Sequence, residues 1–262
     1  MLRIFRRVRY GLSASRNTRR YLFYAFGEMV LVVIGIVIAL QIDNWNEWRQ
    51  EREDEQIVLR QLRDDYRANL AQLEQKMDMR KSIIKASLSV LGAMDTPGEI
   101  KRDTLIGHLT VLLVDPTFDP IENDLSSSGD LRLITNQDLK RLLSNWTADI
   151  VGVRELEQNW SDIVFQQLQP VLTDLGISRD LANYFTNDLK VDWSLAAGAR
   201  LQQQDIGAST QGASVLEITG SKELEGLVSF AITYNATANL QSEILRERIE
   251  EIIAHIDREI QE

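Results

Sequence analysis

The sequence predicts an all-α protein in which one N-terminal transmembrane helix continues into an elongated, extracytoplasmic helical bundle. Two observations lead to this prediction. Residues 21–40 form an apolar stretch long enough to cross a bilayer, and three later segments repeat apolar residues at helical spacing. No alternation of apolar and polar residues is long enough to indicate a sheet. The expected organisation is a basic cytoplasmic tail (1–20), a transmembrane helix (21–43) and a helical domain (44–262).

The composition argues against several classes of site. The 262 residues include no Cys and two His. Disulfides, zinc-thiolate sites and iron–sulfur clusters all need thiols, and His108 and His255 are far apart in the sequence. Phosphate-binding loops and the HExxH and GxSxG motifs do not occur. Acidic clusters at 51–55 and 247–251 alternate with Arg, which is typical of solvated helix faces. We therefore expect no catalytic residue, no metal and no cofactor.

Charge is distributed unevenly along the chain. The first 22 residues contain seven Arg and no acid, so 22 basic and 39 acidic groups remain, and the net charge of −10 is +7 followed by −17. The positive-inside rule then predicts a cytoplasmic N-terminus and a periplasmic C-terminal domain, in a bacterial inner membrane. A charge of −17 would also repel nucleic acid. Residues 1–10 fit either a basic amphipathic segment on anionic lipid or an unstructured topogenic tail.

The apolar stretch has the length and the flanks of a membrane span. Its twenty residues, Tyr21–Leu40, would extend about 30 Å as a helix, which matches the hydrocarbon core of a bilayer. Expected interface anchors precede and follow it: Arg19, Arg20, Tyr21, Tyr24, Trp45 and Trp48. A buried core helix is the first alternative, because only residues 29–40 are free of charge. A cleaved signal peptide is the second, but no A-x-A-like cleavage site follows.

Glu28 is the only charged residue within this stretch. A carboxylate about 10 Å inside the span costs roughly 2–4 kcal/mol unless it is paired, neutralised or able to reach water. Gly27, Gly35 and Ala39 supply small residues, and Gly35 and Ala39 have the spacing that lets helices approach closely. We expect Glu28 and these small residues to mediate helix association, either in a homo-oligomer or with other membrane proteins. The alternative is that Glu28 simply reaches the interface.

Three long helices are predicted beyond the span. The first covers residues 47–91, the second begins at Thr135 or Asn136 and stops at Pro170, and the third covers 221–260. Shorter helices are expected in 171–198, and loops near 95–104, 115–135 and 199–220. The apolar stripe expected on the first helix includes Ile84 and Leu88, and that on the third includes Leu240 and Ile244.

One loop offers a weak candidate for a binding site. Ser127, Ser128 and Gly129 lie in a polar run just before Asn136. No base lies nearby in the sequence to activate a serine, so a loop or a helix cap is the better interpretation than a nucleophile.

The N-terminal sequence also resembles a known family. Residues 21–49, YLFYAFGEMVLVVIGIVIALQIDNWNEWR, are similar to the signature of a family of uncharacterised bacterial single-span membrane proteins, which share a basic start, a Gly-Glu pair, an IGIxIALQI core and an NWNE exit. Residues 118–120 and 125–136 resemble that family's internal SxGxLxxIxN stretch. The family is a domain of unknown function, so the resemblance implies a topology and no activity.

These features lead to three hypotheses. The first is a non-catalytic scaffold or accessory subunit whose partners are the lipid bilayer and other protein chains, including further copies of itself. The second is a ligand-sensing module that signals through a separate partner. The third is a periplasmic enzyme that uses a pair of carboxylates, which would require two facing acids of raised pKa.

Overall fold

The computed structural model describes residues 16–121, 130–189 and 206–260, with only the backbone for 16–20, and every regular element in these ranges is helical. The all-α prediction is thereby confirmed. The chain divides into two compact units, residues 1–57 and 58–262. Helix α2 (Arg16–Asp95) contributes to both units. The division falls at 57/58, whereas the end of the transmembrane helix was expected at residue 43.

The first unit is the N-terminal part of α2. From residue 21 to residue 51 every side chain is exposed, and among the described residues α2 is the single helix long and apolar enough to cross a membrane. The expected span and the helix that follows it are thus one continuous α-helix, without Pro and without a break at the NWNE sequence.

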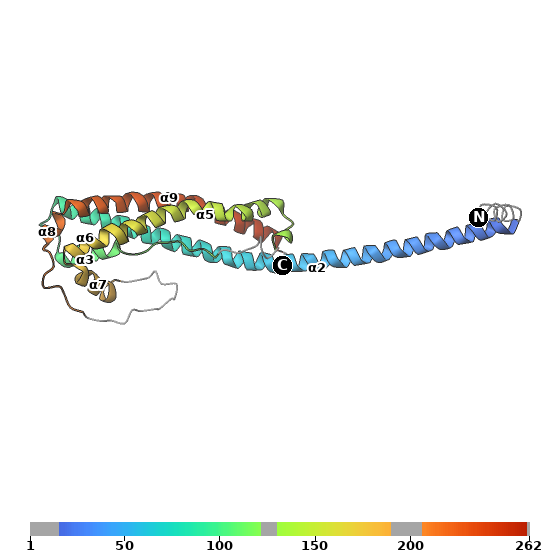
Figure 1. Ribbon diagram of the computed structural model, residues 1–262, viewed down its shortest axis with the longest axis horizontal. Coiled ribbons are helices and arrows are strands. Elements are labelled where there is room, and N and C mark those ends of the chain that lie inside the picture. The colour runs from blue at the N-terminus through green and yellow to red at the C-terminus, as the bar shows by residue number, and fades with distance from the viewer. Residues whose placement is uncertain (1–15, 122–129, 190–205, 261–262) are drawn as a thin grey trace, which may run out of the picture. The chain divides into compact units, whose positions relative to one another are not determined.

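The second unit is built on three long helices that lie side by side (Figure 1). They are the C-terminal part of α2, α5 (Gln137–Ile163) and α9 (Lys222–Glu259). Tyr66 meets Trp146 with ring centroids 5.0 Å apart, and Arg67 pairs with Asp257 at 3.3 Å. Further along α2, Arg80 contacts Glu157 of α5 and Ser242 of α9, so α5 runs in the direction of α2 and α9 runs the opposite way. Four short helices gather at one end: α3 (Arg102–Val111), α6 (Gln169–Asp174), α7 (Ser178–Asn187) and α8 (Val215–Thr219).

Two of the predicted helix starts are confirmed by their caps. The Asn136 side chain accepts hydrogen bonds from the backbone N–H groups of Asp138 and Leu139, both at 3.0 Å. Ser221 accepts one from Leu224 N at 3.2 Å. These caps satisfy amides that the first turn of a helix leaves without a partner, so α5 and α9 begin where the sequence indicated.

The predicted end of the second helix at Pro170 is wrong. Helix α5 passes at Ile163 into a π-helical turn, η2 (Val164–Leu168), and then into α6. Gln169 N donates to Val164 O, five residues earlier, and Pro170 falls in the first turn of α6, where a missing N–H costs little. A π-turn directly before Pro170 thus lets the helical path continue past the proline.

The loop predicted at 199–220 also contains a helix. Residues 190–205 lie outside the described ranges, but 215–219 form α8. Ser214 and Glu217 make a reciprocal capping box there, with Ser214 N donating to the Glu217 carboxylate at 2.7 Å and Glu217 N donating to Ser214 Oγ at 3.3 Å. The loop near 95–104 ends early because α3 begins at Arg102. The 115–135 region carries the short 3₁₀ helix η1 (Asp130–Arg132).

Two apolar clusters form the core of the second unit. One joins α2 from Ile83 onwards to the end of α5 at Trp160, to η2 and the four short helices, and to the first half of α9. The other joins residues 59–77 of α2 to α5 up to Val153 and to the end of α9 from Leu245. On each long helix a gap separates the two clusters.

The predicted apolar stripes are wrong in part. Leu88, Leu240 and Ile244 are 57%, 63% and 58% exposed. On α2 the inner face passes instead through Arg80, Ile83 and Val90, and on α9 it passes through small or polar residues: Ala231, Asn235, Ala238 and Ser242. The periodicity of large apolar residues does not reveal these inner faces, because Arg, Asn, Ser and Ala occupy part of them.

Candidate functional site

The first candidate site is the exposed apolar surface of α2. Its large side chains are unusually open for a folded chain: Phe23 is 72% exposed, Leu31 70% and Ile38 54%. A Cβ atom added at Gly27 or Gly35 would meet nothing within 4 Å. An exposed apolar helix surface of this length, with Glu28 as its single charge, is typical of a surface that contacts lipid or protein.

The helix places three of the four predicted association residues on one face. At 100° per residue, Glu28, Gly35 and Ala39 fall within a narrow arc, because seven and four residues are close to whole numbers of turns. Gly27 precedes Glu28 by one residue and so points about 100° away from it. The small-residue face therefore consists of Glu28, Gly35 and Ala39, without Gly27.

The predicted interface anchors flank the apolar segment in the structure as they do in the sequence. Tyr21 and Tyr24 are exposed on one side of it, and Trp45 and Trp48 on the other. The Arg49 guanidinium lies over the Trp45 ring, 5.8 Å from its centroid, a cation–π geometry. The side chains of Arg19 and Arg20 lie outside the described residues.

Of the predicted loop site, the structure describes Asn136 alone. Ser127, Ser128 and Gly129 lie outside the described residues, and Asn136 is occupied as the cap of α5. Besides accepting the two backbone bonds, Asn136 donates through Nδ2 to Glu259 Oε1 at 2.8 Å. It thus joins the start of α5 to the end of α9, a structural role.

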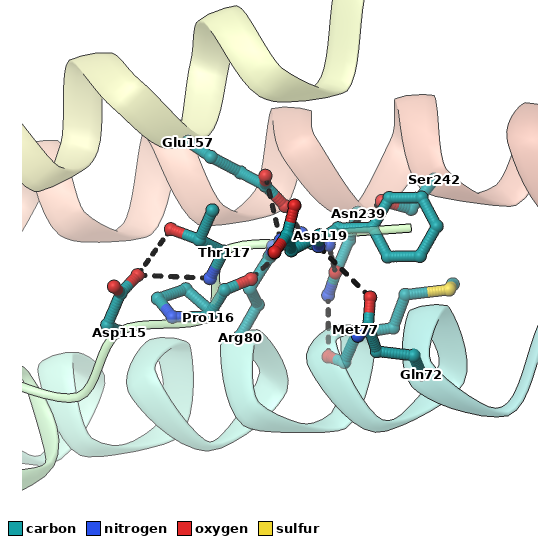
Figure 2. Close-up of polar contacts among 11 residues, drawn as sticks. Gln72, Met77, Arg80, Asp115, Pro116, Thr117, Asp119, Glu157, Asn239 and Ser242 are labelled. Carbon is teal, nitrogen blue, oxygen red and sulfur yellow. Dashed lines mark hydrogen bonds and ion pairs between the residues drawn. The ribbon is translucent and has the colours of Figure 1, made fainter. Parts of the chain in front are cut away.

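A second candidate site lies between the two apolar clusters, where Arg80 of α2 and Glu157 of α5 form an ion pair (Figure 2). The Arg80 side chain is 0% exposed and the Glu157 side chain 1%. From α9, Ser242 Oγ accepts from Arg80 Nη1 at 2.8 Å and Asn239 Oδ1 accepts from the same nitrogen at 3.3 Å. All three long helices therefore meet at Arg80.

The segment that follows α3 completes this polar cluster. Arg80 Nη2 donates to Pro116 O at 3.3 Å, and the Glu157 carboxylate accepts from Phe118 N at 3.0 Å. Asn239 Nδ2 donates to Met77 O at 3.2 Å. Both carboxylate oxygens of Glu157 are consequently engaged, one by Arg80 and the other by Phe118.

Further bonds tie the extended segment 115–121 along α2. Asp119 N donates to Gln72 Oε1 at 3.0 Å, and Asn69 exchanges two bonds with Ile121, at 2.7 and 3.1 Å. Phe118 is fully buried in the cluster that contains Leu59 and Leu245. A segment with no helix of its own thereby satisfies its backbone through polar side chains of α2.

Burial determines the electrostatics of the cluster. It lowers the pKa of Arg80 to about 10, which leaves the guanidinium charged at neutral pH. Lys76, one turn before Arg80, also has a lowered pKa, chiefly through burial, with Asp115 acting in the opposite direction. Because both charges of the Arg80–Glu157 pair are matched and enclosed, neither is available for acid–base chemistry. The cluster can hold the three long helices together, and the side chains of Arg80 and Glu157 are not exposed to solvent.

Sequence reasoning missed this cluster. It did not single out Glu157, and it treated the acidic residues at 51–55 as solvated, although Glu55 pairs with Arg52 and its side chain is 1% exposed. A usable signal existed: Arg80 lies three residues after Met77 and three before Ile83, so it occupies the inner face by helical spacing.

The two histidines do not meet. His108 is half-buried on α3, where burial, and then the nearby Lys85, lower its pKa. His255 lies on α9, in the other half of the unit, with its Nδ1 buried. Among the described residues no group of three or more His, Asp or Glu side chains is placed to hold a metal ion.

Comparison with known proteins identifies one related sequence family. A family of unknown function, DUF6090, matches residues 28–94, which lie wholly within α2. The match starts at Glu28 and ends one residue before α2 does, so the second resemblance, in 118–136, falls outside it. No curated protein and no solved structure matches the chain. The comparison thus relates α2 to a family without a known activity.

Proposed function

We propose that this protein is a non-catalytic, single-pass protein of the bacterial inner membrane that acts as a scaffold or accessory subunit. Residues 21–43 cross the membrane, the basic tail lies in the cytoplasm, and the helical unit lies in the periplasm. One observation carries the proposal: α2 presents an apolar, wholly exposed surface over residues 21–42. The composition supports the direction, because the seven Arg precede this surface and the charge of −17 follows it.

The polar groups of the helical unit support a non-catalytic role. Its most deeply buried ionic group, Arg80 with Glu157, is closed by partners from α2, α5, α9 and segment 115–121. A general acid or base must reach a substrate proton, and these atoms instead reach one another. The cluster holds the helices of the bundle together. A scaffold would bind its partners through the outer surfaces of the bundle.

Membrane integration is tested by extraction at alkaline pH. The full-length protein should stay in the membrane pellet. A Val32→Lys, Ile36→Lys variant should be released, because each lysine costs about 2.5–3.5 kcal/mol at the centre of a span. Leu88→Lys is the matched control, since it also places a lysine at an exposed apolar position of α2 but beyond the span. Release of the wild-type protein would refute the anchor.

Orientation is tested by single cysteines, for which a Cys-free chain is suited. Ser144→Cys, at an exposed position of α5, should react with a membrane-impermeant maleimide in intact spheroplasts. Ser13→Cys, in the basic tail, should react only after lysis. The reverse pattern would place the helical unit in the cytoplasm.

The scaffold role is tested by extracting the native protein in mild detergent and determining the size and composition of what co-purifies. A defined complex of fixed stoichiometry supports an accessory subunit and identifies the process. A chain that elutes alone, or only with itself, contradicts the accessory-subunit role.

A further inference from the structure

The segment 115–121 lies along α2 in a fully extended conformation (Figure 2). Asn69 bonds to Ile121 at one end of the segment, and Arg80 bonds to Pro116 near the other end. The segment therefore runs antiparallel to α2. Five residues of extended chain, from 116 to 121, cover about 16 Å, and eleven helical residues, from 69 to 80, cover about the same length. The segment thus stays in register with the helix over its whole length.

The side chains of this segment alternate between the core and the surface. The inward positions are buried: Pro116, Phe118 and Pro120. The outward positions are exposed or half-buried: Asp115, Thr117, Asp119 and Ile121. A period of two is that of an extended chain. Proline has no backbone N–H, so two of the three inward residues bring no amide donor that would need a partner.

The helices bond to the backbone of the segment. Side chains of α2 and α5 make five such hydrogen bonds, with Pro116 O, Phe118 N, Asp119 N, Ile121 N and Ile121 O. Main-chain hydrogen bonds combined with burial of every second side chain are the means by which proteins bind extended peptides. We call the four side chains that make these bonds the docking track: Asn69, Gln72, Arg80 and Glu157.

Charges beside the docking track complement the outward acids of the segment. Arg154 of α5 pairs with Asp119 at 3.6 Å. Burial lowers the pKa of Lys76, and the nearby carboxylates of Asp115 and Asp119 act in the opposite direction. A peptide that carries acids on its outward side is therefore favoured at this position.

We propose that the docking track is a binding site for an extended peptide of the pattern Pro-x-Phe-x-Pro, occupied in this structure by residues 116–120 of the same chain. Because the track bonds to the backbone and the core takes one aromatic side chain, a peptide of this pattern from another chain makes the same contacts. The chain's own segment is then an intramolecular competitor, which has to leave before a second peptide binds. The inference goes beyond the scaffold role and concerns the helical unit alone.

Supplying the peptide separately tests this inference. In the full-length protein, kept in mild detergent, residues 115–121 are replaced by seven Gly and Ser residues. A fluorescent peptide with the sequence of residues 113–122 is then titrated with this linker variant, and its anisotropy is measured. We expect saturable binding of one peptide per chain. The wild-type protein should bind at least about tenfold more weakly, because its own segment occupies the track.

Two changes establish where the peptide binds. A peptide that carries Phe118→Ala should not bind the linker variant, since it lacks the buried aromatic side chain. Adding Asn69→Ala to the linker variant should weaken binding of the original peptide about tenfold, because two hydrogen bonds are lost. Gln61→Ala, at an exposed position of the same helix, is the matched control and should leave binding unchanged.

A second protein variant decides the matter if the linker variant does not fold. Phe118→Ala in the full-length protein keeps the segment and removes only its buried aromatic ring. The original peptide should raise the melting temperature of this variant, because a ligand that binds the folded state stabilises it, and the Phe118→Ala peptide should not. The inference would be overturned if the original peptide affected neither protein variant, or if both peptides acted equally.

Discussion

Arg80 and Glu157 form an ion pair that is enclosed on all sides, with side-chain exposures of 0% and 1%. It lies in the gap between the two apolar clusters, where α2, α5 and α9 meet. Taking two charges out of water is costly, and their attraction compensates only when the other polar atoms are also satisfied. Ser242, Asn239, Pro116 and Phe118 supply bonds to Arg80 Nη1, to Arg80 Nη2 and to the Glu157 carboxylate, whereas Arg80 Nε is buried without a hydrogen-bond partner among the described residues. The pair therefore requires all four segments to be in register.

Breaking this pair should destabilise the protein strongly. Glu157→Gln leaves the Arg80 charge buried without a counter-charge, and we expect it to reduce the free energy of unfolding by about 3–5 kcal/mol. Thermal unfolding of the full-length protein in detergent, followed by circular dichroism, measures this. Glu155→Gln, at an exposed position of the same helix, should change it by less than about 0.5 kcal/mol. Arg80→Met with Glu157→Met should recover most of the loss. A Glu157→Gln variant as stable as Glu155→Gln would show that the pair is not needed.

The cap of α5 should make a measurable contribution of its own. Asn136→Ala removes the acceptor for two backbone amides and the bond to Glu259. We expect a loss of about 0.5–2 kcal/mol, read from the same unfolding experiment. Asn145→Ala, at an exposed interior position of α5, is the matched control and should cost nothing, because Ala favours the helix interior. Similar losses in both variants would contradict the capping role.

Stability should fall as the pH drops below the ordinary pKa of histidine, because of His108. Burial and Lys85 lower the pKa of His108 in the folded state, so the unfolded chain binds a proton first. The contribution of neutral His108 is complete above pH 6.5, the unfolded value, and is lost as the pH falls from there through the lowered pKa. His108→Gln should make the melting temperature less dependent on pH over this range. A slope unaffected by His108→Gln would exclude His108 as its source.

Glu28 should affect assembly without affecting insertion. Glu28→Leu removes the single charge of the apolar segment, so we expect the protein to remain in the membrane after alkaline extraction. If Glu28 meets a polar group of a neighbouring helix, the variant should give a smaller assembly on size exclusion in mild detergent. Val33→Leu, on the opposite face of α2, is the control. An unchanged size in the Glu28→Leu variant would leave Glu28 as an interfacial residue only.

Short-range patterns explain which parts of the fold were predictable. The starts of α5 and α9 follow from Asn136 and Ser221 with the apolar periodicity after them, and both are interactions within one turn of helix. The end at Pro170 could not be derived in this way. Proline stops a helix where its N–H is required, and the π-turn at 164–168 removes that requirement. Such a turn has no simple signature in the sequence.

The candidate sites also differ in how much of each could be predicted from the sequence. The sequence alone determined the apolar segment at 21–40 and its Arg and aromatic flanks, because these depend on composition. It grouped Gly27 with Glu28, Gly35 and Ala39, although helix geometry turns Gly27 about 100° away from Glu28. Only the tertiary structure decided that Arg80 and Glu157 are buried and that Leu240 and Ile244 are exposed. The physical reason is that burial depends on which distant segment covers a residue. Arg80 is covered by residues 36 to 162 positions away, whereas nothing in the described chain covers Leu240.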